Sequence, residues 1–428
     1  MARLRCDGGW LRDDAGRIVL LRGANVSGRS KFPPFLAVDD PAWFDRLADW
    51  GMNAVRLLVT WEAIEPTRGR YDDDYLAAVA RLVRAAGGRG LHVVVDVHQD
   101  LYARSFGGDG APAWAVRGSG RPVSGRAWFW HYTSRGVQDS FAAFWRDDDG
   151  LQTAFLDAVA RMMSALEGAP AVVGYDLFNE PMAPLVEVLR GRFERGWLAD
   201  FHRRCIGVRD RNAPGRLLFV EPTPLVAFGA PTTLPPLSGD DLVYAPHLYD
   251  ATAILASRFV PRASTFPTAL GRVCATARER SWPLCIGEFG ILGGIAGAPA
   301  LVEDQCARLD RAFASWMVWH FDPGGDDWNE EDASIVLPGG DERPWTAALV
   351  RPFPRALAGT PEFWDSADGQ PWSLRYTADS DAPTEIVIPP RWSAAPQIDV
   401  DGADHALRDC VLVVHARPGA AVRVTLGR

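Results

Sequence analysis

The stretch VVGYDLFNEPM (residues 172–182) begins as a buried strand and ends in an amide, a carboxylate and a proline. Short continuous apolar runs of this kind are typical of parallel strands covered on both faces. Asn179 and Glu180 stand where the run stops, and Pro181 turns the chain out of the sheet because proline cannot donate a backbone hydrogen bond. The architecture must therefore be one in which a core strand ends in polar side chains.

Seven further apolar runs resemble this one, and amphipathic segments such as 74–86 and 151–167 lie between them. The strands that we expect are 18–25, 53–59, 91–98, 172–179, 216–221, 242–247, 284–289 and 313–320. Eight buried strands that alternate with helices predict a (β/α)8 TIM barrel over residues 1–350. A doubly wound sheet is the alternative, but it would be favoured by a Gly-rich phosphate-binding turn after the first strand, and RGANVSGRS (22–30) is not such a turn.

From about residue 351 the helical periodicity disappears, and short runs such as TEIVIP (384–389) alternate with Pro, Gly and Asp. In AVRVTL (421–426) apolar and polar residues alternate, which is typical of a half-buried antiparallel strand. We therefore expect residues 351–428 to form a small antiparallel β-sandwich.

The composition excludes several classes of protein. A net charge of −9 argues against a nucleic-acid partner, because phosphate binding needs a basic face. We find no apolar run long enough to span a membrane and no signal-peptide core at the amino terminus, which predicts a cytoplasmic location as the chain stands, or a secreted one if a leader has been removed. The six cysteines lack metal-ligand spacing, so a zinc site is not expected. The 17 tryptophans suggest sugar-stacking surfaces as well as core.

In a TIM barrel the catalytic face lies at the carboxyl ends of the strands. The side chains at these ends are Asn25, Arg56, His98, Asp100, Asn179, Glu180, Glu221, His247, Tyr249, Glu288, Trp319 and His320. A strand-end His or Glu taken singly is more often structural, but polar groups on nearly every strand indicate a site. Two carboxylates across a cleft, Glu180 and Glu288, are what glycoside hydrolysis requires. A metal hydrolase is the alternative, although the His-x-His usual after its first strand is missing.

The motifs RLLVTWE (56–62), DVHQD (96–100), LFNEP (177–181), APHLYD (245–250), IGEFG (286–290) and VWHFD (318–322) resemble, in this order, those of the family 5 glycoside hydrolases. These are retaining β-glycosidases. DVHQD and APHLYD are most similar to the endoglycoceramidase branch, which frees intact glycans from glycosphingolipids. A β-sandwich after the barrel also resembles that branch.

The resemblance implies catalytic roles that the chemistry supports independently. Glu180 would be the general acid/base, and Glu288 the nucleophile, kept ionised by hydrogen bonds from Arg56 and Tyr249. In a retaining enzyme the two carboxyl groups should lie about 5–5.5 Å apart. Neither a metal nor a cofactor is expected.

The remaining expected site residues bind the substrate. Asn179 would hold the 2-hydroxyl beside the reacting carbon, an interaction that strengthens in the transition state. His98 and His247 would fix the sugar and the acid/base, Trp319 would stack under the sugar, and Asp100 would bind sugar hydroxyls.

Two weaker candidates complete the set. Lys31 is the only lysine in a chain that otherwise uses arginine, and Lys and Arg are not interchangeable in a tight polar site. A solvated surface lysine is an equally good interpretation. Trp128, in AWFWHY (127–132), is a candidate sugar platform, although most aromatics of the long connection 101–171 are expected to pack as a lid over the barrel mouth.

Apolar loops follow strands six and seven, with Ile254, Leu255, Phe259 and Val260 in the first and GILGGIAGAP (290–299) in the second. We expect them to line a groove for a lipid tail and to make any membrane-surface contact, although they could equally pack against each other. The predicted function is therefore a retaining endo-β-glycosidase that cleaves the glycan–ceramide bond of glycosphingolipids, acting as a monomer. Alternatives are an exo-acting β-glucosidase on glucosylceramide or steryl glucosides, an endoglucanase, or a sugar- or lipid-binding module without activity.

Overall fold

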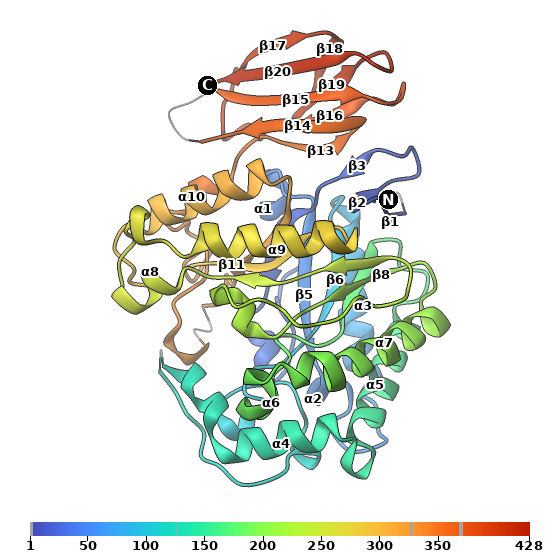
Figure 1. Cartoon of the computed structure of the whole chain (residues 1–428), viewed down its shortest axis with the longest axis vertical. Helices are drawn as coiled ribbons and strands as arrows, with labels where there is room; N and C mark the ends of the chain where they lie inside the picture. Colours follow the sequence, from blue (N-terminus) through green and yellow to red (C-terminus); the bar gives the residue numbers. More distant parts are fainter. Residues whose placement is uncertain (1–2, 126, 326–327, 368–370) are drawn as a thin grey trace.

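The computed structural model describes residues 3–125, 127–325, 328–367 and 371–428, and its centre is a barrel of parallel strands (Figure 1). In chain order the strands are β4 (Arg22–Val26), β5 (Ala54–Thr60), β6 (His92–His98), β7 (Val172–Asp176), β8 (Leu217–Val220), β9 (Leu242–Tyr244), β10 (His247–Leu248), β11 (Cys285–Gly290) and β12 (Ser315–Phe321). We treat β9 and β10 as two parts of one strand, because β9 pairs with β8 and β10 pairs with β11. Pairing of β12 with β4 closes the sheet. The predicted (β/α)8 barrel is confirmed, and an open doubly wound sheet is excluded.

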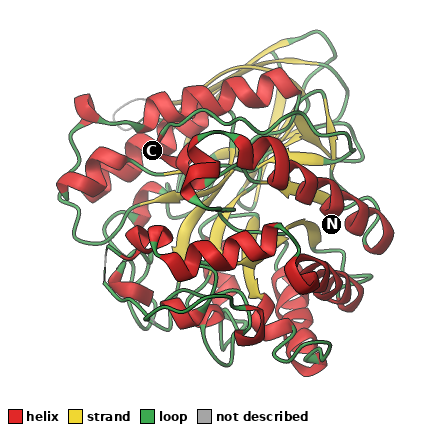
Figure 2. Cartoon of the chain, turned by 60° about the horizontal axis from the view of Figure 1, so that its bottom comes forward, coloured by secondary structure: helices red, strands yellow, loops and turns green. Residues whose placement is uncertain are grey.

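Helices connect the strands and surround them (Figure 2). They are α1 (Trp43–Asp49), α2 (Trp61–Ile64), α3 (Asp73–Gly88), α4 (Arg135–Trp145), α5 (Leu151–Ala165), α6 (Leu185–Leu189), α7 (Ala199–Asn212), α8 (Ala251–Ala256), α9 (Phe266–Arg280) and α10 (Ala298–Arg311). Helix α3 illustrates why these segments are helical. Leu76, Val79 and Val83 recur at helical spacing and are buried, and Asp72 caps the helix by accepting a hydrogen bond from the backbone N–H of Tyr75 at 2.8 Å.

The strands separate an apolar layer from a polar interior. In β5, Val55, Leu57 and Val59 belong to the core shared with the helices, whereas Arg56 lies between them in sequence and contacts side chains of other strands inside the barrel. Successive side chains of a strand point to opposite faces, so a single strand can supply both layers. Cys285 lies in the apolar cluster at the base of the barrel and is buried.

The carboxy-terminal part is an antiparallel sandwich of two sheets, which confirms the predicted fold of this region. Its strands are β13 (Phe353–Leu357), β14 (Gly359–Asp365), β15 (Trp372–Ala378), β16 (Thr384–Val387), β17 (Gln397–Asp401), β18 (Asp404–Arg408), β19 (Val411–His415) and β20 (Ala421–Gly427). One sheet has the order β14-β15-β20-β17. The other begins with three amino-terminal strands, β1 (Arg5–Asp7), β2 (Trp10–Arg12) and β3 (Ile18–Val19), and continues through β13, β16, β19 and β18.

The single strand predicted at 18–25 is therefore wrong in its bounds. Ile18 and Val19 pair with β13 of the sandwich, and the barrel strand begins at Arg22. Leu20 and Leu21 are buried where the chain passes from one sheet to the other. A continuous apolar run does not reveal such a change of sheet. The predicted division of the chain at residue 350 remains a prediction, and residues from both sides of it share one sheet.

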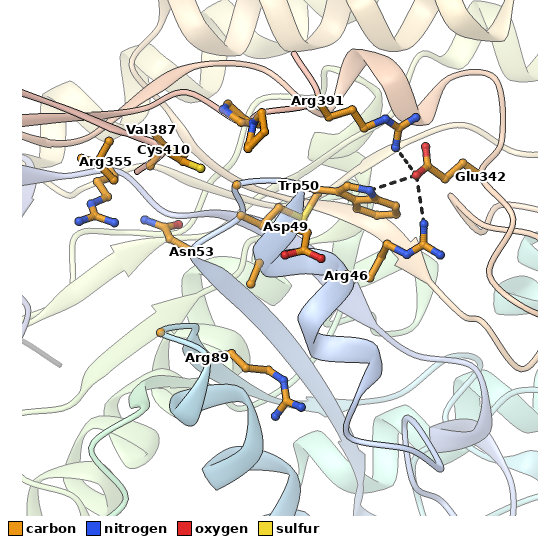
Figure 3. Close-up of a pocket in the computed structure, with 17 residues that line it drawn as sticks. Arg46, Asp49, Trp50, Asn53, Arg89, Glu342, Arg355, Val387, Arg391 and Cys410 are labelled. Atoms are coloured by element: carbon orange, nitrogen blue, oxygen red, sulfur yellow. Dashed lines mark hydrogen bonds and ion pairs between the residues drawn. The ribbon is translucent and has the colours of Figure 1, made fainter. Parts of the chain in front are cut away.

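A cavity of about 700 Å³ lies between α1 and the strands of the sandwich (Figure 3). Its wall includes Asn53 and Gly90, which precede β5 and β6, so the cavity is at the amino ends of the barrel strands. Glu342 joins its two sides by accepting hydrogen bonds from Trp50 at 3.2 Å and from Arg391. This cavity is at the opposite end of the barrel from the predicted site.

Within the described ranges no helix is both long and apolar enough to cross a membrane. All six cysteines lie in these ranges and are free thiols.

Candidate active site

The two predicted catalytic carboxylates meet at the carboxyl end of the barrel. Glu288 lies in β11, and Glu180 follows β7. An oxygen of each carboxylate and a ring nitrogen of His247 all lie within 4.8 Å of one another. His247 is placed there by its register opposite Glu288 in the β10–β11 pair. Inverting glycosidases separate their carboxyl groups by about 6.5–9.5 Å, so this short spacing fits a retaining site.

Glu288 is buried and held on three sides. Arg56 donates to its Oε1 at 3.0 Å, the Tyr249 hydroxyl donates to its Oε2 at 2.8 Å, and His247 Nδ1 lies 3.4 Å from Oε2. Burial and the Glu288 charge raise the pKa of Tyr249 well above its ordinary value, so the phenol keeps its proton. The carboxylate therefore has a fixed orientation and two strong donors.

Arg56 is the centre of a polar network inside the barrel. Its guanidinium contacts the side chains of Asn25, Asp96, Asp176, Asn179, Glu221 and Glu288. Burial opposes the charge, but Asp96 and Asp176 raise the pKa of Arg56 well above its ordinary value. Arg56 donates to Asn179 Oδ1 at 2.9 Å, and the Asn179 NH2 group donates to the Gln99 carbonyl at 3.2 Å, which leaves its second N–H for another acceptor.

Glu180 has an unusual backbone for a residue with a side chain. Its φ is 44°, in the left-handed region. Its N–H donates to Glu221 Oε2 at 2.9 Å, and its carbonyl accepts from Gln99 Nε2 at 3.1 Å. Its carboxylate Oε1 lies 2.9 Å from His247 Nδ1. The side chain is 15% exposed, so it is the more accessible of the two carboxylates.

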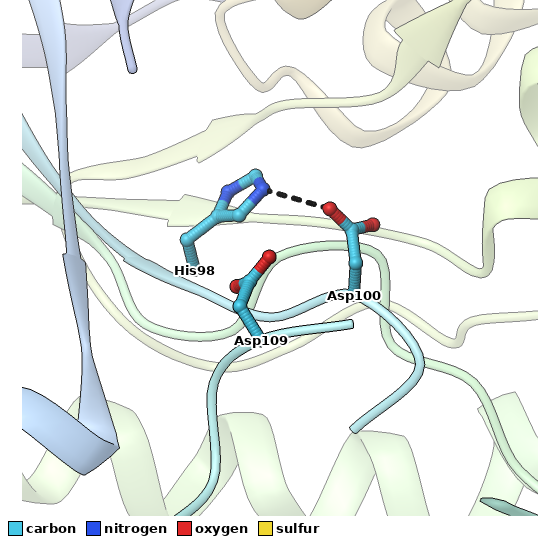
Figure 4. Close-up of side chains that lie close together, drawn as sticks. All are labelled: His98, Asp100 and Asp109. Carbon is cyan, nitrogen blue, oxygen red and sulfur yellow. Dashed lines mark hydrogen bonds and ion pairs between the residues drawn. The ribbon is translucent and has the colours of Figure 1, made fainter. Parts of the chain in front are cut away.

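His98 and Asp100 form a second polar cluster at the end of β6, with Asp109 beside them (Figure 4), and Lys31 completes it. His98 lies 2.7 Å from Asp96 through Nδ1 and 3.3 Å from Asp100 through Nε2. Burial and Lys31 disfavour a charged ring, but the flanking carboxylates raise the pKa of His98 to about 10. His98 is therefore an imidazolium at neutral pH and donates from both nitrogens.

Lys31 is buried in this cluster and is not a surface lysine. Its Nζ lies 2.5 Å from Asp100 and 3.6 Å from Asp109. Like Glu180, His247 and Glu288, the residues His98, Asp100 and Asp109 have donor atoms within 4.8 Å of one another, a spacing that could hold a metal ion. The ammonium of Lys31 already supplies the positive charge that these carboxylates need.

Trp319 extends from the end of β12 between the two clusters. Its ring stacks on His98, with centroids 5.4 Å apart and an angle of 11° between the planes. Lys31 Nζ lies 4.8 Å from the ring centroid, and Tyr249 packs against the same indole. Only 5% of Trp319 is exposed.

Glu331 is a site residue that the sequence analysis missed. Its carboxylate accepts from Trp128 Nε1 at 2.8 Å and from Trp319 Nε1 at 3.3 Å. Burial raises its pKa to about 7, against the effect of Lys31. Trp128 therefore joins Trp319 through a shared acceptor. Asp109 was also missed, because both residues lie in loops where no periodic spacing marks a side chain as buried.

Apolar side chains surround the site on the loops that follow the barrel strands. Seven of the nine large hydrophobic residues that are exposed in the described part of the chain lie on the segments that follow barrel strands: Trp130, Val186, Leu189, Phe228, Leu255, Val260 and Leu337. The loops expected to line a groove do meet, through the backbone bridge between Arg258 and Ala296. Phe259 is only 9% exposed there, but Leu255 is 77% exposed. The loops thus pack on each other and still leave apolar surface uncovered.

Comparisons with known proteins agree with this geometry. The model of the cellulase family, glycosyl hydrolase family 5, matches residues 13–325. The chain is 30% identical to endoglycoceramidase I of Rhodococcus hoagii over 416 residues, 90% of this chain and 79% of that protein. It is 29% identical to a glucosylceramidase of Aspergillus fumigatus over 252 residues, which are 44% of this chain and 33% of that one.

Among solved structures, endo-glycoceramidase II from Rhodococcus sp. in complex with ganglioside GM3 is 29% identical, with a TM-score of 0.86 over 98% of this chain and 99% of that one. The same enzyme as a lactosyl-enzyme intermediate gives a TM-score of 0.84 at 29% identity, over 98% of this chain and all of that one. The family match covers the barrel and the relatives extend through the sandwich. The chain is therefore a glycoside hydrolase and belongs to glycosyl hydrolase family 5.

Proposed function

We propose that the chain is a retaining endo-β-glycosidase that hydrolyses the bond between glycan and ceramide in glycosphingolipids. Glu288 attacks the anomeric carbon as Glu180 gives its proton to the departing ceramide oxygen, and the electrons of the broken C–O bond stay on that oxygen. The covalent glycosyl ester is then attacked by water, whose proton returns to Glu180. The fixed, doubly hydrogen-bonded Glu288 and the short carboxylate separation support these roles.

The polar clusters fit the glycan. Asn179, held by Arg56, is oriented to donate its amide to the 2-hydroxyl of the sugar at Glu288. Trp319 offers an indole face for stacking and Trp128 extends this surface. His98, His247, Asp100 and Lys31 supply charged donors and acceptors for the other hydroxyls and for the acid/base.

The exposed apolar side chains on the loops around the site support ceramide as the aglycone. A polysaccharide enzyme needs polar and aromatic subsites on both sides of the reacting bond. Here exposed aliphatic residues such as Leu189 and Leu255 lie beside the site. Apolar patches of this kind mark partner or membrane contacts. A glycosphingolipid at a micelle or bilayer surface would place its glycan on the polar residues inside the barrel and its ceramide on the apolar loops. This substrate therefore explains both features.

Thin-layer chromatography of the products tests the proposal. The purified protein is given ganglioside GM3, glucosylceramide and a cello-oligosaccharide in separate reactions. Release of intact oligosaccharide together with ceramide is the expected result. Turnover of the soluble cello-oligosaccharide alone would exclude a lipid substrate.

A β-glucosidase that removes a single glucose from glucosylceramide or a steryl glucoside is the second candidate. The likeness of the barrel to a fungal glucosylceramidase favours it. It would release free glucose from glucosylceramide and leave the ganglioside intact. Binding of glycolipid without any product would instead indicate a module that has lost its activity.

A further inference from the structure

We propose that Glu221 is a positioning residue for the acid/base Glu180. It stands at the end of β8 and is 2% exposed. The inference rests on the proposed role of Glu180 as proton donor. It does not depend on the identity of the aglycone.

The backbone of Glu180 needs support. A left-handed φ at a residue with a Cβ costs about 1–3 kcal/mol and persists only where neighbouring contacts enforce it. Glu221 Oε2 accepts the Glu180 N–H at 2.9 Å, while Gln99 donates to the carbonyls of Asn179 at 2.8 Å and of Glu180 at 3.1 Å. These bonds hold both sides of the strained residue.

The other oxygen of Glu221 acts on the side chain. Glu221 Oε1 lies 3.3 Å from His247 Nε2, and the opposite nitrogen of that ring, Nδ1, lies 2.9 Å from Glu180 Oε1. The imidazole thus lies among three carboxylates, since its Nδ1 is also 3.4 Å from Glu288 Oε2, and Glu221 in addition accepts the backbone N–H of Glu180. Asp–His pairs in metal and nucleophile sites orient the imidazole in the same manner.

Two further contacts fix the position of Glu221 itself. His202 of α7 donates from Nε2 to the Glu221 backbone carbonyl at 3.0 Å, and Arg56 donates to Oε1 at 3.1 Å. A buried carboxylate with this many partners has one orientation. Glu221 contacts the backbone of Glu180 directly and is linked to Glu288 only through Arg56 and His247, so its direct effect is on the proton donor.

The chemistry offers a test specific to proton donation. A dinitrophenolate leaves without a proton, whereas an alkoxide departs only if an acid protonates it. Loss of acid catalysis therefore slows alkyl glycosides much more than dinitrophenyl glycosides. A general loss of structure slows both alike.

The experiment measures kcat/KM of wild type, Glu221→Ala and Glu221→Gln on 2,4-dinitrophenyl and octyl β-lactosides, and on the corresponding β-glucosides. We expect Glu221→Ala to lower the octyl rate by about 100-fold or more and the dinitrophenyl rate by less than about 10-fold. Glu221→Gln keeps an acceptor for the Glu180 N–H, so we expect its octyl rate to lie between those of wild type and Glu221→Ala. Glu180→Ala should show the same selectivity, and the double variant should be no slower than Glu180→Ala on the octyl substrate.

Glu194→Gln is the matched control. Glu194 is equally buried and binds the backbone of Thr223, in the loop that follows Glu221, without contacting Glu180. The Glu194→Gln variant should lose stability, but its kcat/KM should change by the same factor on the octyl and the dinitrophenyl substrates. Equal losses on both substrates in both Glu221 variants, or additive losses in the double variant, would overturn the proposal. Failure of the ceramide proposal would appear separately, as a wild type that hydrolyses these glycosides but releases no ceramide.

Discussion

Lys31 is enclosed by two carboxylates and two indoles, and the enclosure fits an ammonium. Its Nζ lies 2.5 Å from Asp100 and 3.7 Å from the ring centroid of Trp328. Lys31→Arg must place a larger, planar group there, at a cost of about 1–3 kcal/mol. Lys31→Met removes the ammonium that pairs with Asp100 and Asp109, which should cost about 3–5 kcal/mol.

Urea unfolding of both Lys31 variants measures these losses, and kcat/KM on an aryl lactoside should fall with them. Arg29→Lys, in the same turn but with a side chain that is 42% exposed, is the control. A fully stable and active Lys31→Arg would show that the site has no need of a compact ammonium.

Glu288 has a role that its amide cannot perform. Glu288→Gln keeps an oxygen and an NH2 group near Arg56 and Tyr249 but cannot form the glycosyl ester. We expect a loss of about 10⁴-fold or more in kcat with the fold retained. Burst kinetics with a dinitrophenyl glycoside should show no covalent intermediate. Substantial hydrolysis by this variant would exclude double displacement through Glu288.

Glu331 should make the stability of the protein depend on pH. Its pKa in the folded protein is raised to about 7 by burial. In the unfolded chain it is about 4.3. The folded state therefore holds the proton more tightly, so this contribution is fully present below about pH 4.3 and is lost as the pH rises through 7.

Glu331→Gln removes that titration. The fall in unfolding free energy between pH 5 and 7 should become shallower by up to about 1.4 kcal/mol per pH unit. Asp109, whose pKa burial also raises to about 7, contributes with the same sign and remains in the variant. Urea midpoints at four pH values measure both slopes, and identical slopes would contradict the assignment.

Single residues differ in how far the sequence can place them. Glu180 and Glu288 were predictable because each stands at or near the end of a run predicted as a buried strand, and parallel strands bring their ends to one rim. Glu331 was not, since its partner Trp128 lies some two hundred residues earlier and loop geometry leaves no periodic pattern. The buried position of Lys31 could be suspected only from its rarity.

At the scale of elements, the regular parts followed from periodicity. Segments 74–86 and 151–167 are α3 and α5, because their apolar residues recur every three to four positions. The strand at 18–25 failed because both of its halves are buried, each in a different sheet. An apolar run indicates that a segment is buried, but it does not show which sheet the segment pairs with.

The short helices α6 and α8 are the elements that we expect to contact lipid. Leu189 is 70% exposed on α6 and Leu255 is 77% exposed on α8. Replacing both by Asp should lower hydrolysis of ganglioside in mixed micelles by about 10-fold, because about 1–3 kcal/mol of apolar burial is lost. Soluble dinitrophenyl lactoside should be hydrolysed as before.

Leu407→Asp is the control for these variants. Leu407 is 46% exposed on β18 of the sandwich, away from the rim. Its substitution should change neither reaction. If the rim variants cleave micellar ganglioside as fast as wild type, the lipid does not rest on α6 and α8.

At the scale of the whole molecule, the sandwich covers a buried ion pair of the barrel. Arg22 of β4 pairs with Asp310 of α10, and its guanidinium lies 4.8 Å from Phe353 and 4.5 Å from Trp364, both in the sandwich. Removing residues 351–428 would uncover this charge and the apolar residues around it. We expect the truncated chain to be insoluble, and the full chain to melt in one transition by calorimetry. Two separate transitions would show that the parts fold independently.

The pairing of β3 with β13 also constrains how the protein is made. Ile18 leaves the ribosome early, but its partner Leu357 follows only after most of the chain has been synthesised. At about 5–20 residues per second this takes on the order of tens of seconds. During that time the apolar edge of β3 has no partner strand, because the rest of the chain is still being synthesised. Unpaired edges of this kind can pair with other chains and cause aggregation. The yield of native enzyme should therefore depend on the pace of translation and on chaperones that shield the first strands until the last ones arrive.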